Sequence, residues 1–443
     1  MSSVVSVMDK PLAELSREDI IEFSRKRGEP EWVLRLRLKA YEYIRSTSYD
    51  PSIDPYMEKV TYRQFLEGLE KPLIVDEQLA KAARRLGIRP DELEIIYSGF
   101  SVNIDNVVIK TVLKMLEKRG VILTSMDEAV KRYPVVKDYA FRGLHPTLSK
   151  KVAYHVMLWA GGIFVYVPEG VRLPQPIQGL FIIGKEGLSQ TEHTLIVLEE
   201  GAELHWIEGC TAPLRLSYGV HLGGLEAFVK DRARLFVVSI NNWPGDVHHT
   251  PAKRVIVEGY KAYAELTSVS LAAKTVNVAP RIDLRGQDST AVIQNIGLYR
   301  GNQVVRSSPL IVYEAPGTRG QLLNRTVVKD SADEEFRGRL EVRRGAKGAT
   351  GFMSCNTLII GDKARSAAIP AIASEERDSE LSHEASVGRI SYEKLYYLQL
   401  MGFDEEEATW LIVSGFFDPV IKKLPFDIQI EVRKILELAV KGH

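Results

Sequence analysis

The chain contains 443 residues, of which 45% are hydrophobic and 26% charged, and its 58 basic side chains balance 58 acidic ones. This composition is typical of a folded protein of two to four domains and excludes disorder as the main state. Balanced charge gives the molecule no overall attraction to nucleic acid or to an anionic membrane, so neither is an expected partner.

The longest apolar run, Val156–Val167, is shorter than the ~20 residues that a membrane-spanning helix needs. The N-terminal residues also lack the apolar stretch of a secretion signal. Two cysteines in a chain of this length fit a reducing compartment. We therefore expect a cytoplasmic protein.

Residues 1–150 are predicted to form a mostly helical N-terminal domain. Apolar residues recur at helical spacing over Glu31–Arg45, and Pro30 stands near the helix start, where proline is tolerated. Two further helices are predicted, over Ile109–Arg119 and over Met126–Arg132.

Residues 151–390 show the period-two alternation and the β-branched residues of short strands. A junction of charged or glycine residues, followed by a small residue, recurs along this segment. The small residues are separated by 31, 29, 27 and 29 positions: Ala202, Ala233, Ala262, Ser289 and Thr318. Such a period predicts stacked turns on a common core, and hence a parallel β-helix. Later junctions recur at about half this spacing, which suggests a β-helix of two sheets with one corner per half turn. A β-sandwich is the alternative to the β-helix.

Residues 391–443 are predicted to be helical again. One helix is expected over Tyr392–Met401, and Asp404 is expected to cap a second, which begins with three glutamates. The last helix has an apolar face made of Ile428, Val432, Ile435, Leu436 and Ala439.

The motifs of several enzyme classes are absent from the sequence. No phosphate-binding loop of the form G-x-x-x-x-G-K-[ST] occurs, so any energy from a nucleotide must come from a partner. Two cysteines exclude both a disulfide-stapled scaffold and a four-cysteine metal site within one chain. The pair His248-His249 lies in a Pro/Gly-rich loop and is interpreted as plain surface histidines.

Cys210 shares strand parity with Leu204 and Trp206, so its side chain is predicted to point inward, near Glu208. Inert packing is the plain interpretation of a buried cysteine.

Cys355 has the opposite parity to Phe352 and Leu358 and is predicted to face outward. Glu384 follows it by 29 residues, about one turn of the repeat, and is also predicted to face outward, with His383 on the inner parity. Strands of adjacent turns lie about 4.8 Å apart, so the thiolate and the carboxylate could form half of an iron site. Solvated side chains are the alternative.

Seven segments resemble the SufB/SufD family of iron–sulfur cluster assembly scaffolds. They are Glu29–Trp32, Gly161–Val171, Glu192–Thr194, Glu208–Pro213, Asn242–Asp246, Ile360–Ala364 and Ser382–Ala385. The Glu-Pro-Glu-Trp helix start, the cysteine at 355 and the acid at 384 are similar to SufB rather than SufD.

The resemblance implies a right-handed parallel β-helix between N-terminal and C-terminal helical domains. It also implies a SufC-like ABC-type ATPase bound to the C-terminal helices, and dimerisation through the β-helix with a SufD-like or a second SufB-like chain. The expected sulfur source is a cysteine desulfurase system. The expected cargo is a transient iron–sulfur cluster. Neither the type of cluster nor flavin binding can be predicted from the sequence.

In the family that the chain resembles, the cysteine matching Cys210 is proposed to accept persulfide sulfur. The residues matching Cys355 and Glu384 are implicated in building the cluster, and the neighbouring histidine matches His383. The chain is therefore expected to be an assembly scaffold rather than an enzyme. Two alternatives are kept: a metal-free SufD-like partner, which needs neither Cys355 nor Glu384, and a β-helix carbohydrate-active enzyme.

Overall fold

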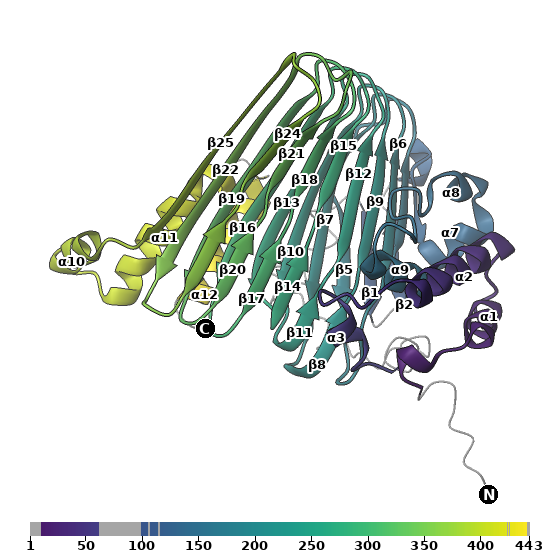
Figure 1. Ribbon diagram of the computed structural model, residues 1–443, viewed down its shortest axis with the longest axis horizontal. Helices are drawn as coiled ribbons and strands as arrows, with labels where there is room; N and C mark the ends of the chain where they lie inside the picture. The colour runs from purple at the N-terminus through teal and green to yellow at the C-terminus, as the bar shows by residue number, and fades with distance from the viewer. Residues whose placement is uncertain are drawn as a thin grey trace, which may run out of the picture.

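The computed structural model describes residues 10–61, 99–104, 107–113, 116–422, 424 and 426–440. Its centre is a parallel β-helix, with helices before it and after it in the chain (Figure 1). The prediction of a parallel β-helix is thereby confirmed, and the β-sandwich is excluded. The prediction of two sheets is wrong, because the turns form three.

The largest sheet has ten strands and runs the whole length of the β-helix. Its order is β2 (Val107–Leu113), β1 (Gly99–Ile104), β5 (Ile177–Ile182), β7 (Glu203–Thr211), β10 (Arg234–Asn242), β13 (Tyr263–Ala272), β16 (Thr290–Tyr299), β19 (Arg319–Lys329), β22 (Ala349–Ile360) and β25 (Ser379–Arg389).

The other two sheets are built from shorter strands of the same turns. The nine-stranded sheet has the order β24 (Ala371–Ser374), β21 (Arg339–Val342), β18 (Leu310–Tyr313), β15 (Arg281–Leu284), β12 (Ala252–Val257), β9 (Gly224–Val229), β6 (His193–Leu198), β4 (Ile163–Val167) and β3 (Ile122–Ser125). The six-stranded sheet has the order β23 (Arg365–Ala368), β20 (Asp333–Phe336), β17 (Val304–Ser307), β14 (Thr275–Val278), β11 (Gly245–His249) and β8 (Leu216–His221).

The small residues at the predicted junctions mark one corner of each turn. Ala202 and Ala233 are fully buried, and the backbone N–H of Arg234 donates to the carbonyl of Ala202 in the turn below (2.8 Å). The residue before each small residue has a positive φ, as at Gly201 (66°) and Arg232 (55°). Glycine adopts this left-handed conformation freely and other residues do so at a cost, so each junction is a sharp local turn.

The N-terminal helices pack beside the first turns (Figure 1). They are α1 (Arg17–Lys26), α2 (Glu31–Ser46), α3 (Asp54–Met57), α7 (Met126–Arg132), α8 (Pro134–Tyr139) and α9 (Lys150–Leu158), with 3-10 turns η2 (Leu12–Glu14) and η4 (Glu117–Arg119). The predicted helices over Glu31–Arg45 and Met126–Arg132 are confirmed. The predicted helix over Ile109–Arg119 is wrong, because this segment holds β2 and η4. The β-branched run that begins at Val107 pairs antiparallel with β1, and this pairing decides its conformation.

The buried side chain of Arg37 fixes helix α2 to the end of α9 by hydrogen bonds and forms an ion pair with Glu29. Arg37 is fully buried, its Nη2 lies 2.6 Å from Glu29 Oε1, and it donates to the carbonyls of Met157 (2.7 Å) and Trp159 (2.8 Å). Burial by itself would raise the pKa of Glu29, but the charges of Arg37 and then Arg27 outweigh it and hold that pKa at about 2.

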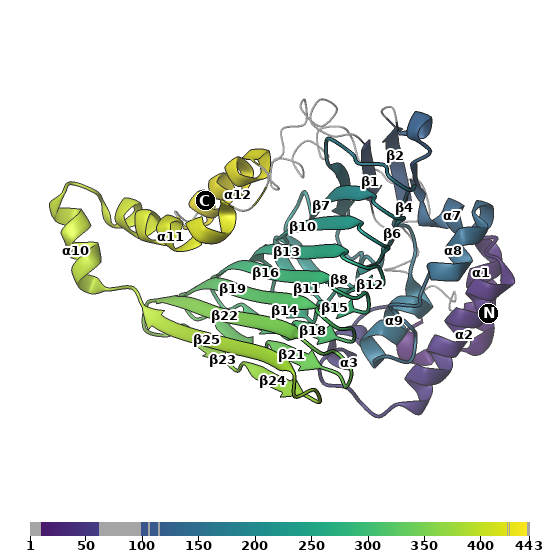
Figure 2. The same cartoon turned by 90° about the horizontal axis from the view of Figure 1, so that it is seen from above.

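The C-terminal helices are α10 (Tyr392–Leu400), α11 (Glu405–Ile421) and α12 (Phe426–Val440). Asp404 caps α11, as predicted, and the structure adds a capping box with Glu407. Helices α11 and α12 bury Val413, Phe417 and Leu436 against the outer face of the ten-stranded sheet, whereas α10 extends away from the body (Figure 2). Among the described residues, no helix has the length and apolar character needed to cross a bilayer.

Candidate functional site

Cys210 points into the β-helix, as predicted, and packs in the same core cluster as Leu204 and Trp206. Glu208 is buried on the same face, where it accepts from Ser239 Oγ (2.6 Å) and pairs with Lys253. Burial raises the pKa of the Cys210 thiol well above its usual range, and the carboxylates of Glu208 and Glu192 raise it further.

Cys355 also points inward, so the prediction that it faces outward is wrong. It is fully buried in the interior cluster together with Met353. Parity misled the prediction because the outer face of β22 is apolar as well: Leu358 and Ile360 pack against the cluster beneath α11 and α12. Burial raises the pKa of the Cys355 thiol to about 12, and the carboxylates of Glu334 and Glu384 add to this shift.

Glu384 and His383 lie on β25, the last strand of the ten-stranded sheet, and both are exposed. The register pairs Ser354 with Glu384, and Ser354 Oγ donates to Glu384 Oε1 (2.7 Å). Cys355 pairs with Ala385 instead, and His383 pairs with Met353 on the inner parity. Within one chain, the Cys355 thiol and the Glu384 carboxylate therefore face opposite sides of the sheet.

Two rows of mostly polar residues cross the interior along the ten-stranded sheet. In each row, every residue is the register partner of the next one. The first row is Glu208, Ser239, Ser268, Asn295, Asn324 and Cys355, and the second is Cys210, Asn241, Ser270, Gly297, Thr326 and Thr357. We call these two rows together the polar band.

The polar band connects the two cysteines. Five strand spacings, or about 24 Å, separate β7 from β22. Asn295 Nδ2 donates to Asn324 Oδ1 (2.8 Å) within it. Two interior cavities border it and share Asn241, His249, Pro251 and Lys253; one reaches Cys210 and the other reaches Leu322 and Phe336. This band was not predicted from the sequence, although the successive repeats have a polar residue at the same inner position of each turn.

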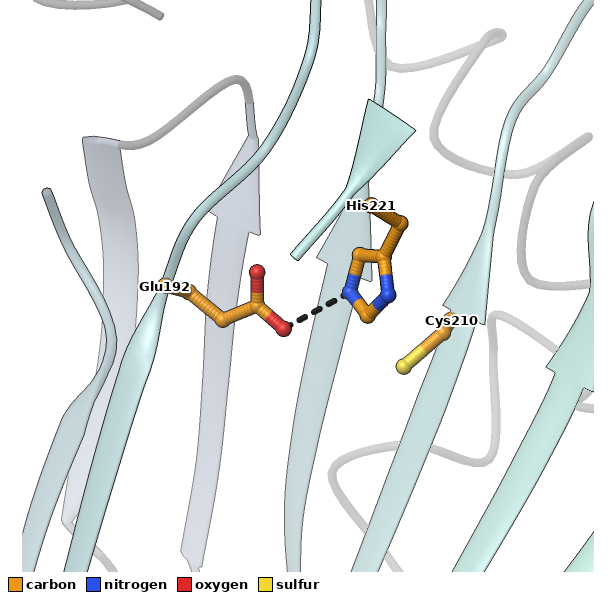
Figure 3. A group of neighbouring side chains, drawn as sticks. All are labelled: Glu192, Cys210 and His221. Atoms are coloured by element: carbon orange, nitrogen blue, oxygen red, sulfur yellow. Dashed lines mark hydrogen bonds and ion pairs between the residues drawn. The ribbon is translucent and has the colours of Figure 1, made fainter. Parts of the chain in front are cut away.

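Three possible metal ligands meet at the Cys210 end of the band. Glu192 directly precedes β6, Cys210 lies in β7 and His221 ends β8, and these three strands belong to three different sheets. Figure 3 shows the three side chains together. Their ligand atoms all lie within 4.8 Å of one another, and His221 Nε2 is 2.8 Å from Glu192 Oε1. All three residues are at least 95% buried. Neither Glu192 nor His221 was predicted from the sequence to be a metal ligand.

His249 stands directly behind this cluster. It is 2% exposed, so the interpretation of His248-His249 as plain surface histidines is wrong for His249; His248 is half-buried and stacks on Tyr56. The Nδ1 of His249 lies 2.9 Å from His221 Nδ1 and accepts from Trp243 Nε1 (3.1 Å). Burial, and then the charges of His221 and Lys253, lower the pKa of His249 well below its usual range, so its ring is neutral.

Comparisons with known proteins agree on one family. The family model of the SUF system FeS cluster assembly SufBD core domain matches residues 181–416, and that of the SufBD protein N-terminal region matches residues 96–179. An iron–sulfur cluster assembly SufBD family protein of Pyrococcus horikoshii is 33% identical to this chain, and the alignment covers 100% of both. The iron–sulfur cluster assembly protein SufB of Bacillus subtilis is 30% identical over 97% of this chain and 93% of its own.

Proposed function

Because the chain belongs to the SufBD family of iron–sulfur cluster assembly proteins, we propose that it is a scaffold subunit on which sulfur and iron combine into a nascent cluster. In this proposal Cys210 accepts persulfide sulfur. Cys355 then holds the growing cluster with His383, groups from a partner chain and Glu384, once opening of the β-helix has brought Cys355 and the Glu384 carboxylate to one side of the sheet. The observation that carries the proposal is the polar band, which has one of the two cysteines of the chain at each end.

Sulfur enters by exchange at Cys210. The Cys210 thiolate attacks the outer sulfur of a persulfide on a cysteine desulfurase system, and the donor cysteine leaves as a thiolate. Cys355 is about 24 Å away, too far to attack the new persulfide directly. The sulfur therefore crosses the interior as hydrosulfide, and its release from Cys210 takes two electrons and a proton from an external thiol reductant.

Both steps require the β-helix to open. The raised pKa values keep both thiols protonated at neutral pH, and a thiol is a poor nucleophile and a poor metal ligand. In our proposal a SufC-like ABC-type ATPase supplies this rearrangement from the C-terminal helices, in the cytoplasm. Helix α10 and the Met401 that caps its end offer it an exposed apolar surface, which on the helix consists of Tyr392, Tyr396, Tyr397 and Leu400.

The cluster site is completed by a second chain. Strand β25 ends the ten-stranded sheet and is exposed over most of its length, with Glu384 and His383 on it. An unpaired edge strand is a ready surface for pairing with another sheet. A SufD-like or a second SufB-like chain on this edge would bring its own ligands close to Cys355, where a single chain offers too few for a cluster.

The decisive experiment is anaerobic reconstitution with iron and sulfide in the presence of the ATPase and partner chains, followed by absorbance and Mössbauer spectroscopy. We expect wild type to hold a cluster and Cys355→Ser to lose it. Cys210→Ser is the matched control, because free sulfide bypasses sulfur acceptance and the cluster should still form. If wild type forms no cluster, the scaffold role is wrong and the metal-free role of a SufD-like partner replaces it. If Cys355→Ser keeps the cluster, the function stands and the site is wrong.

A further inference from the structure

We propose that Glu192, Cys210 and His221 bind one divalent transition-metal ion at the cysteine that accepts sulfur, so that the chain takes up iron at this end of the polar band as well. The ligand geometry is independent of the proposed function, and only the choice of Fe²⁺ as the natural ion rests on it. This site is separate from the cluster site at Cys355, which lies five strand spacings away.

The hydrogen-bond network fixes which nitrogen of His221 faces the cluster. Trp243 Nε1 can only donate, so His249 Nδ1 carries no proton. The neighbouring His221 Nδ1 must therefore be the donor in its contact with His249 (2.9 Å). With Nδ1 as the donor, His221 turns its other ring nitrogen, Nε2, toward Glu192. A histidine that donates from one ring nitrogen and offers the other has the orientation found at metal sites.

His221 Nε2 and Glu192 Oε1 are in direct contact, 2.8 Å apart. A ring nitrogen and a carboxylate oxygen at this distance need either a proton or a cation between them. The other oxygen of Glu192, Oε2, is buried and has no hydrogen-bond partner in the described part of the chain. The same holds for Asn241 Oδ1, which borders the same cavity. Buried oxygens of this kind are costly unless something binds them.

The site has room for an ion because residue 223 is glycine. A Cβ at Gly223 would collide with the Glu192 carboxylate and would crowd His221. The cavity at this point is lined by Glu192, Cys210, His221 and Asn241. Ligand atoms of a tetrahedral site with bonds of about 2.0–2.3 Å lie roughly 3.3–3.8 Å apart, so three atoms within 4.8 Å need only a small adjustment.

Ligand type and charge both fit a divalent transition ion. Thiolate, imidazole and carboxylate together suit Fe²⁺ and Zn²⁺ rather than Mg²⁺ or Ca²⁺. The two anionic ligands cancel the double positive charge, so the loaded site is neutral and can remain buried. On binding, the thiol proton of Cys210 and any proton between His221 and Glu192 leave to solvent. Three protein ligands leave a fourth position open for a sulfur species.

Cobalt(II) is the probe for this site, added anaerobically to the full-length chain without sulfur donor, sulfide or partner. The mixture is left until its spectrum is constant, because the ion reaches the buried site and displaces the thiol proton only as the β-helix opens. The chain has two cysteines, so a thiolate-to-cobalt charge-transfer band must come from one of them. Replacing each cysteine in turn shows which one binds the ion. We expect one equivalent of Co²⁺ to produce this band, with the visible spectrum of a tetrahedral ion. The band should be lost in Cys210→Ser and unchanged in Cys355→Ser, which is the matched control.

Two conservative variants test the other ligands. Glu192→Gln keeps the shape of the side chain, and His221→Asn keeps a donor towards His249. Each should weaken Co²⁺ binding at least tenfold. Co²⁺ at a few times its wild-type dissociation constant should raise the thermal midpoint of wild type and shift that of either variant much less, which a purely structural role would not produce. Circular dichroism checks that the variants fold.

A band that survives Cys210→Ser or disappears in Cys355→Ser would overturn the proposal, and so would the absence of any thiolate band in wild type. Unchanged affinity in both Glu192→Gln and His221→Asn would do the same. None of these outcomes touches sulfur acceptance, which is measured separately by transfer of labelled persulfide to Cys210. The two proposals can therefore fail independently.

Discussion

At the scale of single residues, the two cysteines are buried thiols with raised pKa values, and this sets when they can react. The pKa of Cys355 is raised to about 12 and that of Cys210 well above its usual range, in both cases mainly by burial. A thiolate is the reactive form. In the folded, closed chain both cysteines are therefore poor nucleophiles, although the proposed function needs them to react.

Thiol labelling tests this at the residue scale. At pH 8 a thiol with a pKa near 12 is about 10⁻⁴ ionised, against about a quarter for an ordinary thiol. The variant Cys210→Ser keeps Cys355 as its single thiol. We expect this thiol to react with iodoacetamide at least about a thousandfold more slowly in the folded variant than in the variant unfolded by urea. Fast labelling of the folded variant at pH 8 would contradict the burial of Cys355.

The same shift has a consequence for stability. Above about pH 8.5 the thiols of the unfolded chain lose their protons while those of the folded chain keep them. The unfolded state is then favoured, so the free energy of unfolding should fall as the pH rises beyond that point.

At the scale of elements, α2 depends on one buried ion pair. Arg37 is fully buried and holds both Glu29 and the end of α9. Removing one partner of such a pair leaves a charge without compensation in a low-dielectric environment. The exposed pair of Arg35 and Glu31 on the same helix has no such cost.

Urea unfolding of two matched variants tests this difference. We expect Arg37→Met to lower the free energy of unfolding by about 3 kcal/mol, at the low end for a broken buried pair because Arg27 still contacts Glu29. Arg35→Met should change it by less than about 0.5 kcal/mol. Equal effects of the two substitutions would show that Arg37 does not anchor the helix.

The sequence alone predicts some of these elements and not others. The recurring small residues, such as Ala202 and Ala233, are enough to predict a parallel β-helix. The alternation of residues along the strand is enough to predict that the Cys210 side chain points inward. Parity fails at Cys355 because both faces of β22 are apolar, one in the interior and one beneath α11 and α12. Glu192 and His221 meet Cys210 from different sheets, so no local pattern could bring them together.

At the scale of the whole molecule, the two ends of the ten-stranded sheet differ. At one end β2 pairs antiparallel with β1 and interrupts the parallel stacking. At the other end β25 follows the stacking of the other turns, and its inner residues are exposed, among them Val387 at 43%. Another chain stacked on this end would bury that face.

Light scattering after size exclusion tests this end as the pairing surface. We expect Val387→Lys to abolish the pairing that wild type forms with itself or with a SufD-like chain, because a charge would then lie within the continued core. Val304→Lys is the control, since Val304 is exposed to a similar extent (38%) on β17. Pairing that survives Val387→Lys would move the interface elsewhere.

The stacked turns also fix a length. Each turn contributes one residue to each row of the polar band, so the distance between β7 and β22 is a whole number of strand spacings. Insertions in the corner loops leave this distance unchanged, because they enlarge the circumference of a turn and not the number of turns. The path can be lengthened or shortened only by gaining or losing an entire turn of 27 to 31 residues, a change of about 4.8 Å each time. The distance along the β-helix therefore changes only in whole strand spacings. Relatives with very different loop lengths can keep the same distance between the two strands that correspond to β7 and β22.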